Sequence, residues 1–134
     1  MAPHGSPSLT SVMFVAFATL ASGHVAAESP PTGALEVIAR VNVAARHMDY
    51  VALRADMIQD FRWSFGGDSS AEQAIDEWKK QSVYMRRLDR ATRARCTYRQ
   101  DKYVECPANA GTSFRAGFKL NEGQWKMVYF IGGD

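Results

Sequence analysis

The sequence predicts an α+β fold in which a curved, mostly antiparallel sheet wraps around three helices. Two observations carry this prediction. Apolar residues recur every three or four positions in three stretches of the chain, which is typical of amphipathic helices. Alternating or continuous apolar runs, typical of strands, occur once between the second and third helix and then fill the C-terminal part. This order indicates an α+β domain, and residues 28–134 suffice for one such domain and not for two.

The first 27 residues are expected to be a signal peptide, because they lack Lys, Arg, Asp and Glu and contain an apolar run at 12–20 followed by small residues. That run is shorter than the roughly 20 residues that a membrane span needs. Cleavage after Ala27 leaves a tether at 28–32 and a domain at 33–134, exported to the periplasm or secreted, with no stable membrane anchor. An uncleaved anchor and a wrongly chosen start codon are the alternatives.

The first helix is expected at 34–46, with Leu35, Ile38, Val41 and Ala45 as its buried stripe. Asp49 is expected to cap a second helix. The apolar residues of that second helix are Val51, Leu53, Met57 and Ile58.

Strict alternation at 60–65 predicts a half-buried strand with its aromatic residues on one face. The inward residues are Phe61, Trp63 and Phe65, and the outward ones are Asp60, Arg62 and Ser64. Residues 69–72 have the pattern of a capping box and open a third helix. A break of this helix near Ser82 is the alternative to one continuous helix. Its inward residues are Ile75, Trp78, Met85 and Leu88.

The third helix is acidic where it begins and basic where it ends, which complements the helix dipole. A solvated face explains this arginine run, and a surface for an acidic protein partner is the alternative. A nucleic-acid partner is not expected, because the net charge is only +2 and no aromatic residues alternate with the arginines. The arginines concerned are Arg86, Arg87, Arg90, Arg93 and Arg95.

Cys96 and Cys106 are the only cysteines and lie symmetrically about Asp101. In a hairpin with its loop at 100–102 they are directly opposite each other, within disulfide reach. An oxidising compartment then indicates a structural disulfide. No metal or other cofactor is expected, because zinc needs four ligands and His47 lies far away in sequence. A catalytic pair of a cysteine with His47 is the alternative, and the disulfide accounts for both thiols with fewer assumptions.

Two strands are expected at 114–120 and 124–131, joined by a three-residue loop at 121–123. The last strand is apolar on both faces, which indicates a sheet covered on both sides. A second copy of the chain is the expected cover of the outer face, so we expect a homodimer. Trp125, Met127, Tyr129 and Ile131 are expected to point inward, and Val128 and Phe130 outward.

This order of elements resembles the nuclear transport factor 2-like superfamily, also called SnoaL-like or ketosteroid-isomerase-like. The resemblance covers residues 33–134 and rests on 60–63 as the strand after two helices and on the closing segment 123–131. It implies a cone-shaped fold whose cavity commonly holds an apolar ligand. Isomerases of this superfamily use a strand Asp with a Tyr and a protonated Asp. The matching base and Tyr positions carry Phe65 and Val37 here, so the resemblance does not transfer that chemistry.

The expected function is therefore binding of a small apolar ligand or a protein partner. A SnoaL-like acid–base enzyme is one alternative, with Asp60 as its candidate catalytic residue. A cell-envelope interaction module that uses the arginine-rich helix is the other. His47, between the first two helices, is expected to have a surface role. The candidate ligand-binding residues are Trp63, Tyr84, Phe118, Trp125 and Tyr129, for which plain core packing is the alternative.

Overall fold

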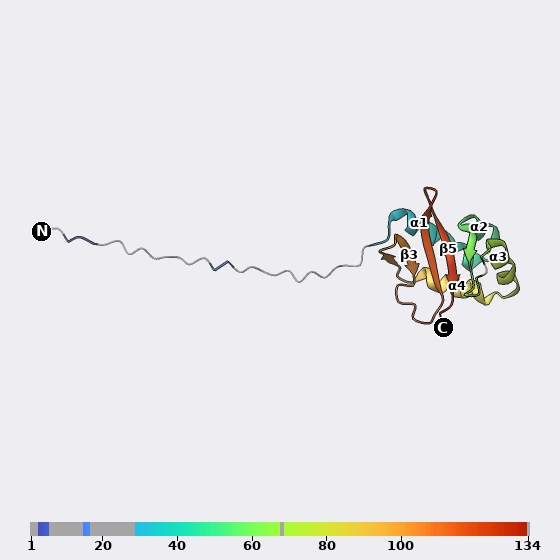
Figure 1. Cartoon of the computed structure of the whole chain (residues 1–134). Helices are drawn as coiled ribbons and strands as arrows, with labels where there is room; N and C mark the ends of the chain where they lie inside the picture. The colour runs from blue at the N-terminus through green and yellow to red at the C-terminus, as the bar shows by residue number, and fades with distance from the viewer. Residues whose placement is uncertain (1–2, 6–14, 17–28, 68, 134) are drawn as a thin grey trace.

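The computed structural model describes residues 3–5, 15–16, 29–67 and 69–133; apart from the two short stretches, the expected signal peptide and its cleavage site lie outside the described residues. The described part is an α+β domain with a mixed five-stranded sheet, so the α+β part of the prediction is confirmed. Four helices replace the expected three (Figure 1). The elements are α1 (Thr32–His47), α2 (Tyr50–Ala55), β1 (Met57–Arg62), α3 (Ala71–Lys80), α4 (Val83–Arg93), β2 (Thr97–Arg99), β3 (Tyr103–Cys106), β4 (Arg115–Asn121) and β5 (Gln124–Ile131).

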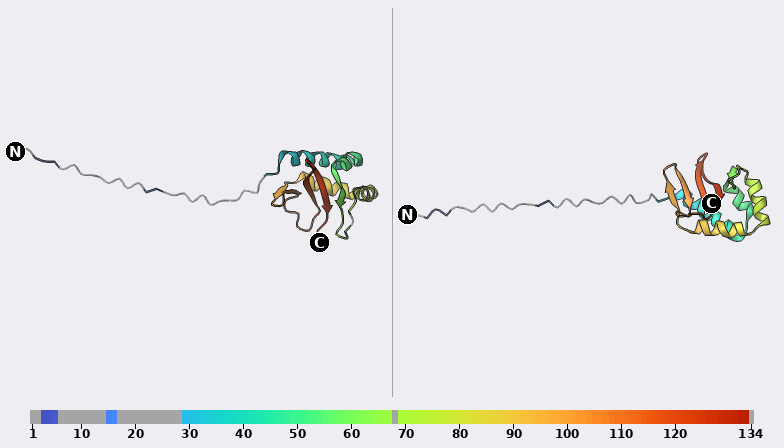
Figure 2. Two further views of the ribbon diagram at one scale, coloured as in Figure 1. Left: turned by 45° about the horizontal axis from the view of Figure 1, so that its top comes forward. Right: turned by 60° about the horizontal axis from the view of Figure 1, so that its bottom comes forward.

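The sheet has the strand order β1-β5-β4-β3-β2. Strand β1 runs parallel to β5, and the other neighbouring strands are antiparallel. Helices α1 and α4 pack on each other and on one side of the sheet, as both views in Figure 2 show. The hydrophobic core fills the space between these helices and the sheet. We call the opposite side the outer sheet face.

Helix α1 is confirmed, with one correction to its buried stripe. Ile38, Val41 and Ala45 are buried as expected, but Leu35 is 48% exposed. Each helical residue is rotated by about 100° from the one before it, so Leu35 lies beyond the edge of the stripe that begins at Ala34. The buried side consists of Ala34, Val37, Ile38, Val41, Ala44 and Ala45.

Asp49 caps α2 as expected, because its carboxylate accepts a hydrogen bond from the Ala52 amide at 3.0 Å. The helix ends at Ala55, so Met57 and Ile58 were wrongly assigned to it. They belong to β1, because the parallel neighbour β5 pairs with this strand from Met57 onward. The start of β1 is decided by its pairing with β5. The hydrophobic pattern of residues 50–58 alone does not reveal that pairing.

Strand β1 accordingly begins and ends three residues earlier than predicted. Phe61 is fully buried as expected, whereas Phe65 lies past the strand in a turn and is 63% exposed. Ser70 caps α3 by accepting from the Gln73 amide, one residue later than the predicted capping box. The expected alternative of a break near Ser82 is what the structure has, because the chain bends at Gln81 and starts α4 against α1.

The hairpin of β4 and β5 has a two-residue turn rather than the predicted three-residue loop, because Asn121 pairs with Gln124. Both residues between them, Glu122 and Gly123, have positive φ, which is the geometry of a tight hairpin turn.

A β-bulge in this hairpin corrects the predicted sides of β5. Phe118 pairs with Met127, but the preceding Gly117 pairs with Tyr129, so Val128 is an extra residue without an opposite partner. After the bulge the alternation is reversed. Phe130 therefore points into the core with 1% exposure, and Tyr129 lies on the outer sheet face.

Ile131 follows Tyr129 on that outer face, where it pairs with Arg115, so it does not point inward as predicted.

Candidate functional site

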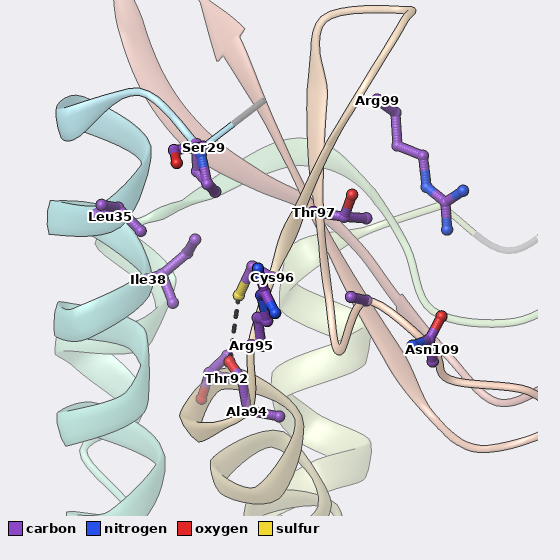
Figure 3. A pocket seen from close by; sticks show the side chains of 12 residues that line it. Ser29, Leu35, Ile38, Thr92, Ala94, Arg95, Cys96, Thr97, Arg99 and Asn109 are labelled. Atoms are coloured by element: carbon purple, nitrogen blue, oxygen red, sulfur yellow. Dashed lines mark hydrogen bonds between the residues drawn. The ribbon is translucent and has the colours of Figure 1, made fainter. Parts of the chain in front are cut away.

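A groove of about 650 Å³ opens between the first half of α1 and the segment that joins α4 to β2 (Figure 3). One wall is apolar and comes from α1, where Leu35 is half exposed above the buried Ile38. The opposite wall is mostly polar and comes from the end of α4 and the cysteine hairpin. The groove is lined by Ser29, Pro30, Leu35, Ile38, Thr92, Ala94, Arg95, Cys96, Thr97, Arg99, Ala108 and Asn109.

A side-chain network holds the two walls at a fixed separation. Asn42 of α1 donates hydrogen bonds to the carboxylate of Asp89 at 2.9 Å and to the hydroxyl of Thr92 at 3.1 Å. The Thr92 hydroxyl in turn donates to the Leu88 carbonyl at 2.7 Å. These hydrogen bonds join α1 to α4 beneath the groove, and they occupy the hydroxyl of Thr92, which lines it.

The predicted disulfide between Cys96 and Cys106 is confirmed and forms part of the groove wall. Its Cα atoms are 4.4 Å apart, and the neighbouring pairs Thr97 with Glu105 and Tyr98 with Val104 have the predicted register about Asp101. The dashed line in Figure 3 joins the Cys96 sulfur to the Ala94 carbonyl oxygen, 3.6 Å away. That sulfur has no proton to donate, because it is bonded to Cys106.

Arg95 brings a positive charge to the groove. It is exposed at the groove, and within the described part of the chain it has neither an ion pair nor a hydrogen bond from its side chain. Arg99, at the far end, is different, because its guanidinium donates to the carboxylate of Glu105 at 3.1 Å. The free guanidinium beside an apolar wall suits a ligand that has both an apolar body and an anionic group.

The rest of the arginine run in α4 is partly engaged. Arg93 forms an ion pair with Asp89 at 2.9 Å, and Arg87 stacks over the ring of Phe114 at 4.5 Å. Docking of an acidic protein by this run stays a prediction. Arg86 and Arg90, on the same helix, are exposed as well.

A second polar cluster, which the sequence analysis missed, lies on the outer sheet face. Glu105 is 7% exposed, accepts a hydrogen bond from the Tyr129 hydroxyl and pairs with Arg99. Gly117 makes this possible, because a Cβ at that position would overlap the Tyr129 ring, which lies across the strand. A glycine inside a predicted strand was the available signal, since it often marks the close approach of another group.

Burial, and secondly the hydrogen bond to Glu105, raise the pKa of Tyr129 well above the ordinary tyrosine value of about 10. The phenol is therefore a hydrogen-bond donor in the folded protein at any physiological pH. Because the folded-state pKa is raised, the stabilisation by this group is fully present below about pH 10 and is lost as the pH rises above that value.

We expect Glu105→Gln to lower the pKa of Tyr129 toward its ordinary value, because the variant removes the negative charge beside the phenol. Phenolate absorbance, measured as the difference from the same protein carrying Tyr129→Phe, reports this one residue. When Tyr129→Phe is introduced into the otherwise unchanged protein, the increase in phenolate absorbance near pH 10 should keep its amplitude. A loss of amplitude there would contradict the raised pKa.

The five candidate ligand-binding aromatics do not gather around the groove. Phe118 is fully buried in the core, while Tyr129 lies on the outer sheet face. Trp125 packs against α1, where a Cβ on Gly33 would come within 2.8 Å of its indole. None of the three lines the groove.

Tyr84 makes an edge contact with Phe114, with ring centroids 5.9 Å apart. Trp63 follows β1, and its buried indole nitrogen has no hydrogen-bond partner in the described part of the protein. Neither residue lines the groove. Ligand binding by any of the five stays a prediction.

The acid–base candidates are both at the surface. Asp60 is exposed on β1, and His47 is exposed at the last turn of α1. A catalytic role of Asp60 therefore stays a prediction that lacks support from burial. Among the described residues, no group of three or more His, Cys, Asp or Glu side chains is placed to hold a metal ion. No helix within the described ranges has the length and apolar character to cross a bilayer.

Comparison with known proteins gives no match among family models, curated proteins or solved structures. The resemblance to the nuclear transport factor 2-like superfamily rests on the order of elements and on the residues named for it.

Proposed function

We propose that this chain is an exported binding module of the nuclear transport factor 2-like kind, whose groove holds a small amphipathic anion. The apolar body of the ligand lies on Leu35 and Ile38, and its carboxylate or phosphate group binds the Arg95 guanidinium. The observation that carries the proposal is the charge of Arg95, which has no ion-pair partner among the described residues and lines the same groove as the apolar wall of α1.

The size of the groove supports a small molecule. Its volume of about 650 Å³ lies within the usual range for such sites, roughly 300–1,000 Å³. Asn109 adds a polar side chain on the same wall as Arg95, so the anionic group has a second donor within the groove. Thr92 lines the groove and is held by Asn42 and Asp89 beneath it, which reduces the entropy that binding would cost.

Two further observations support the remaining parts of the proposal. Helices and strands follow one another in the order on which the superfamily resemblance rests. The disulfide between Cys96 and Cys106 is typical of an oxidising compartment, as expected for an exported protein.

Decanoate, a fatty-acid anion, is a suitable probe for this function. We expect it to bind the purified protein, and we expect Arg95→Gln to weaken that binding by about tenfold, the usual effect of losing one hydrogen-bonded charge. Isothermal calorimetry measures both affinities. Arg86→Gln is the matched control, because Arg86 is an exposed arginine of α4 outside the groove.

Decanol tests the contribution of the anionic group separately. Decanol should bind the parent protein more weakly than decanoate does. Its affinity for the Arg95→Gln variant should equal its affinity for the parent protein. Equal decanoate affinity in the parent and in Arg95→Gln would show that the groove is not an anion site.

A further inference from the structure

Helix α1 has apolar side chains on its exposed side as well as on its buried side. Val43 is 46% exposed, and Ala39 is exposed one turn before it. Beside them, α1 and α2 enclose a hollow of about 610 Å³ with a mostly apolar lining. The apolar residues of that hollow are Ala39, Val43, Ala44, Ala52 and Ala55. We call Glu36, Ala39, Val43 and Arg46, which follow one another on the exposed side of α1, the α1 stripe.

The charges at the two ends of the α1 stripe are opposite. Glu36 lies near the start of the helix, and Arg46 and His47 are the basic residues of its last turn. Within the described ranges, neither Glu36 nor Arg46 takes part in an ion pair. Glu36 does interact electrostatically with Arg40, four residues further along α1, but the ion pair of Arg40 is with Asp56. The helix's own dipole accounts for basic residues in the last turn. It does not account for an exposed valine and alanine between the two charges.

We propose that the α1 stripe is a self-association surface, on which α1 of a second copy packs in antiparallel orientation about the level of Val41. Glu36 lies five residues before Val41 and Arg46 five residues after it, so antiparallel packing brings Glu36 to the level of the partner's Arg46. Ala39 and the partner's Val43 meet in the same way at the centre.

This arrangement is favourable on three counts. Each charge pair occurs twice because the interface is two-fold symmetric. The dipoles of the two antiparallel helices attract each other. The small side chain of Ala39 lets the helices approach, and the exposed Val43 is then removed from water.

The outer sheet face, where the sequence suggested a dimer contact, is a poorer surface for a second copy. Its only carboxylates among the described strand residues are Asp60 and Glu105, and Glu105 is already paired with Arg99. A two-fold axis through this face would place like charges opposite one another, which is destabilising. The basic residues on it are Arg62, Arg99, Arg115, Lys119 and Lys126.

Sedimentation velocity of the purified protein tests the proposal. We expect a dimer at high micromolar concentration, and we expect Val43→Asp to raise the dimer dissociation constant by about tenfold or more, because a carboxylate would be desolvated at the centre of the interface. Val51→Asp is the matched control. Val51 is 85% exposed and lies on α2 beside α3, outside the α1 stripe, so this variant should remain dimeric.

Charge reversal tests the antiparallel pairing itself. Glu36→Arg and Arg46→Glu should each weaken the dimer, and the double variant should restore it. Positions 36 and 46 are too far apart to interact within one helix, where only residues three or four apart meet, so the rescue reports a contact between copies. Circular dichroism checks that each variant is folded.

Three results would overturn the proposal: a monomeric parent protein, a dimer that Val43→Asp leaves unchanged, or a double charge variant no better than the single ones. The proposal does not depend on ligand binding in the groove, because none of the four residues of the α1 stripe lines it.

Discussion

Phe130→Ala is expected to lower the free energy of unfolding by about 3–5 kcal/mol, the usual cost of removing a large aromatic side chain from a core. Phe130 is 1% exposed. Its ring packs against Trp78 and Phe114, with centroid distances of 5.9 Å and 5.2 Å. Truncation would therefore leave a cavity where α3, β5 and the loop before β4 meet. Urea denaturation followed by tryptophan fluorescence measures the change.

Phe65→Ala is the matched control. Phe65 is 63% exposed, so folding buries little of its apolar surface. Its expected effect is within about 0.5 kcal/mol of zero, as for most surface substitutions. Had β5 no bulge, Phe130 would point outward and the two variants would behave alike. A small effect of Phe130→Ala would therefore contradict the sides that the structure assigns to β5.

Loss of the disulfide is the second large effect. We expect the double variant Cys96→Ser, Cys106→Ser to be less stable by about 2–3 kcal/mol. The bond joins residues only ten positions apart, so it lowers the conformational entropy of the unfolded chain by a modest amount. Cys106 is fully buried, so the serine hydroxyl at that position adds a further cost. Thermal unfolding with and without a reducing agent gives the same comparison for the unmodified protein.

The decanoate assay separates stability from function in that variant. Since Cys96 belongs to the groove wall, we expect the folded double variant to bind decanoate more weakly than the parent. Reductant should have no effect on the unfolding of the double serine variant. An equal effect of reductant on the unmodified protein and on this variant would contradict the role assigned to the disulfide.

The cysteine hairpin shows what local sequence can predict. Its register follows from symmetry about Asp101, and all three strand pairs agree with it. Helix α1 was found from its helical periodicity and strand β5 from a run that is apolar on both faces, because one strong apolar pattern decides each of them. The start of β1 was not predicted correctly. Met57 becomes a strand residue only by pairing with β5, which follows far along the chain.

The bulge at Val128 explains why the site was predicted less well than the fold. Strict alternation places Tyr129 inward, and one extra residue reverses every side chain that follows. Glu105 was missed for a related reason. A charged residue in a strand is expected to face solvent, and only the cross-strand neighbours Gly117 and Tyr129 show that this one is covered. The groove depends on Arg95 and Leu35 lying close together, which no local pattern indicates.

Strand β2 has only three residues and forms one free edge of the sheet. A long exposed edge offers unpaired backbone groups to other chains, and short edge strands are a common protection against aggregation. Here the disulfide fastens that short strand over β3, whose Val104 and Cys106 are fully buried. If β2 detaches after reduction, β3 becomes the edge and presents its unpaired backbone groups, with Val104 and Cys106 beside them, to other chains. In a reducing compartment the same chain would therefore be prone to aggregate by strand addition.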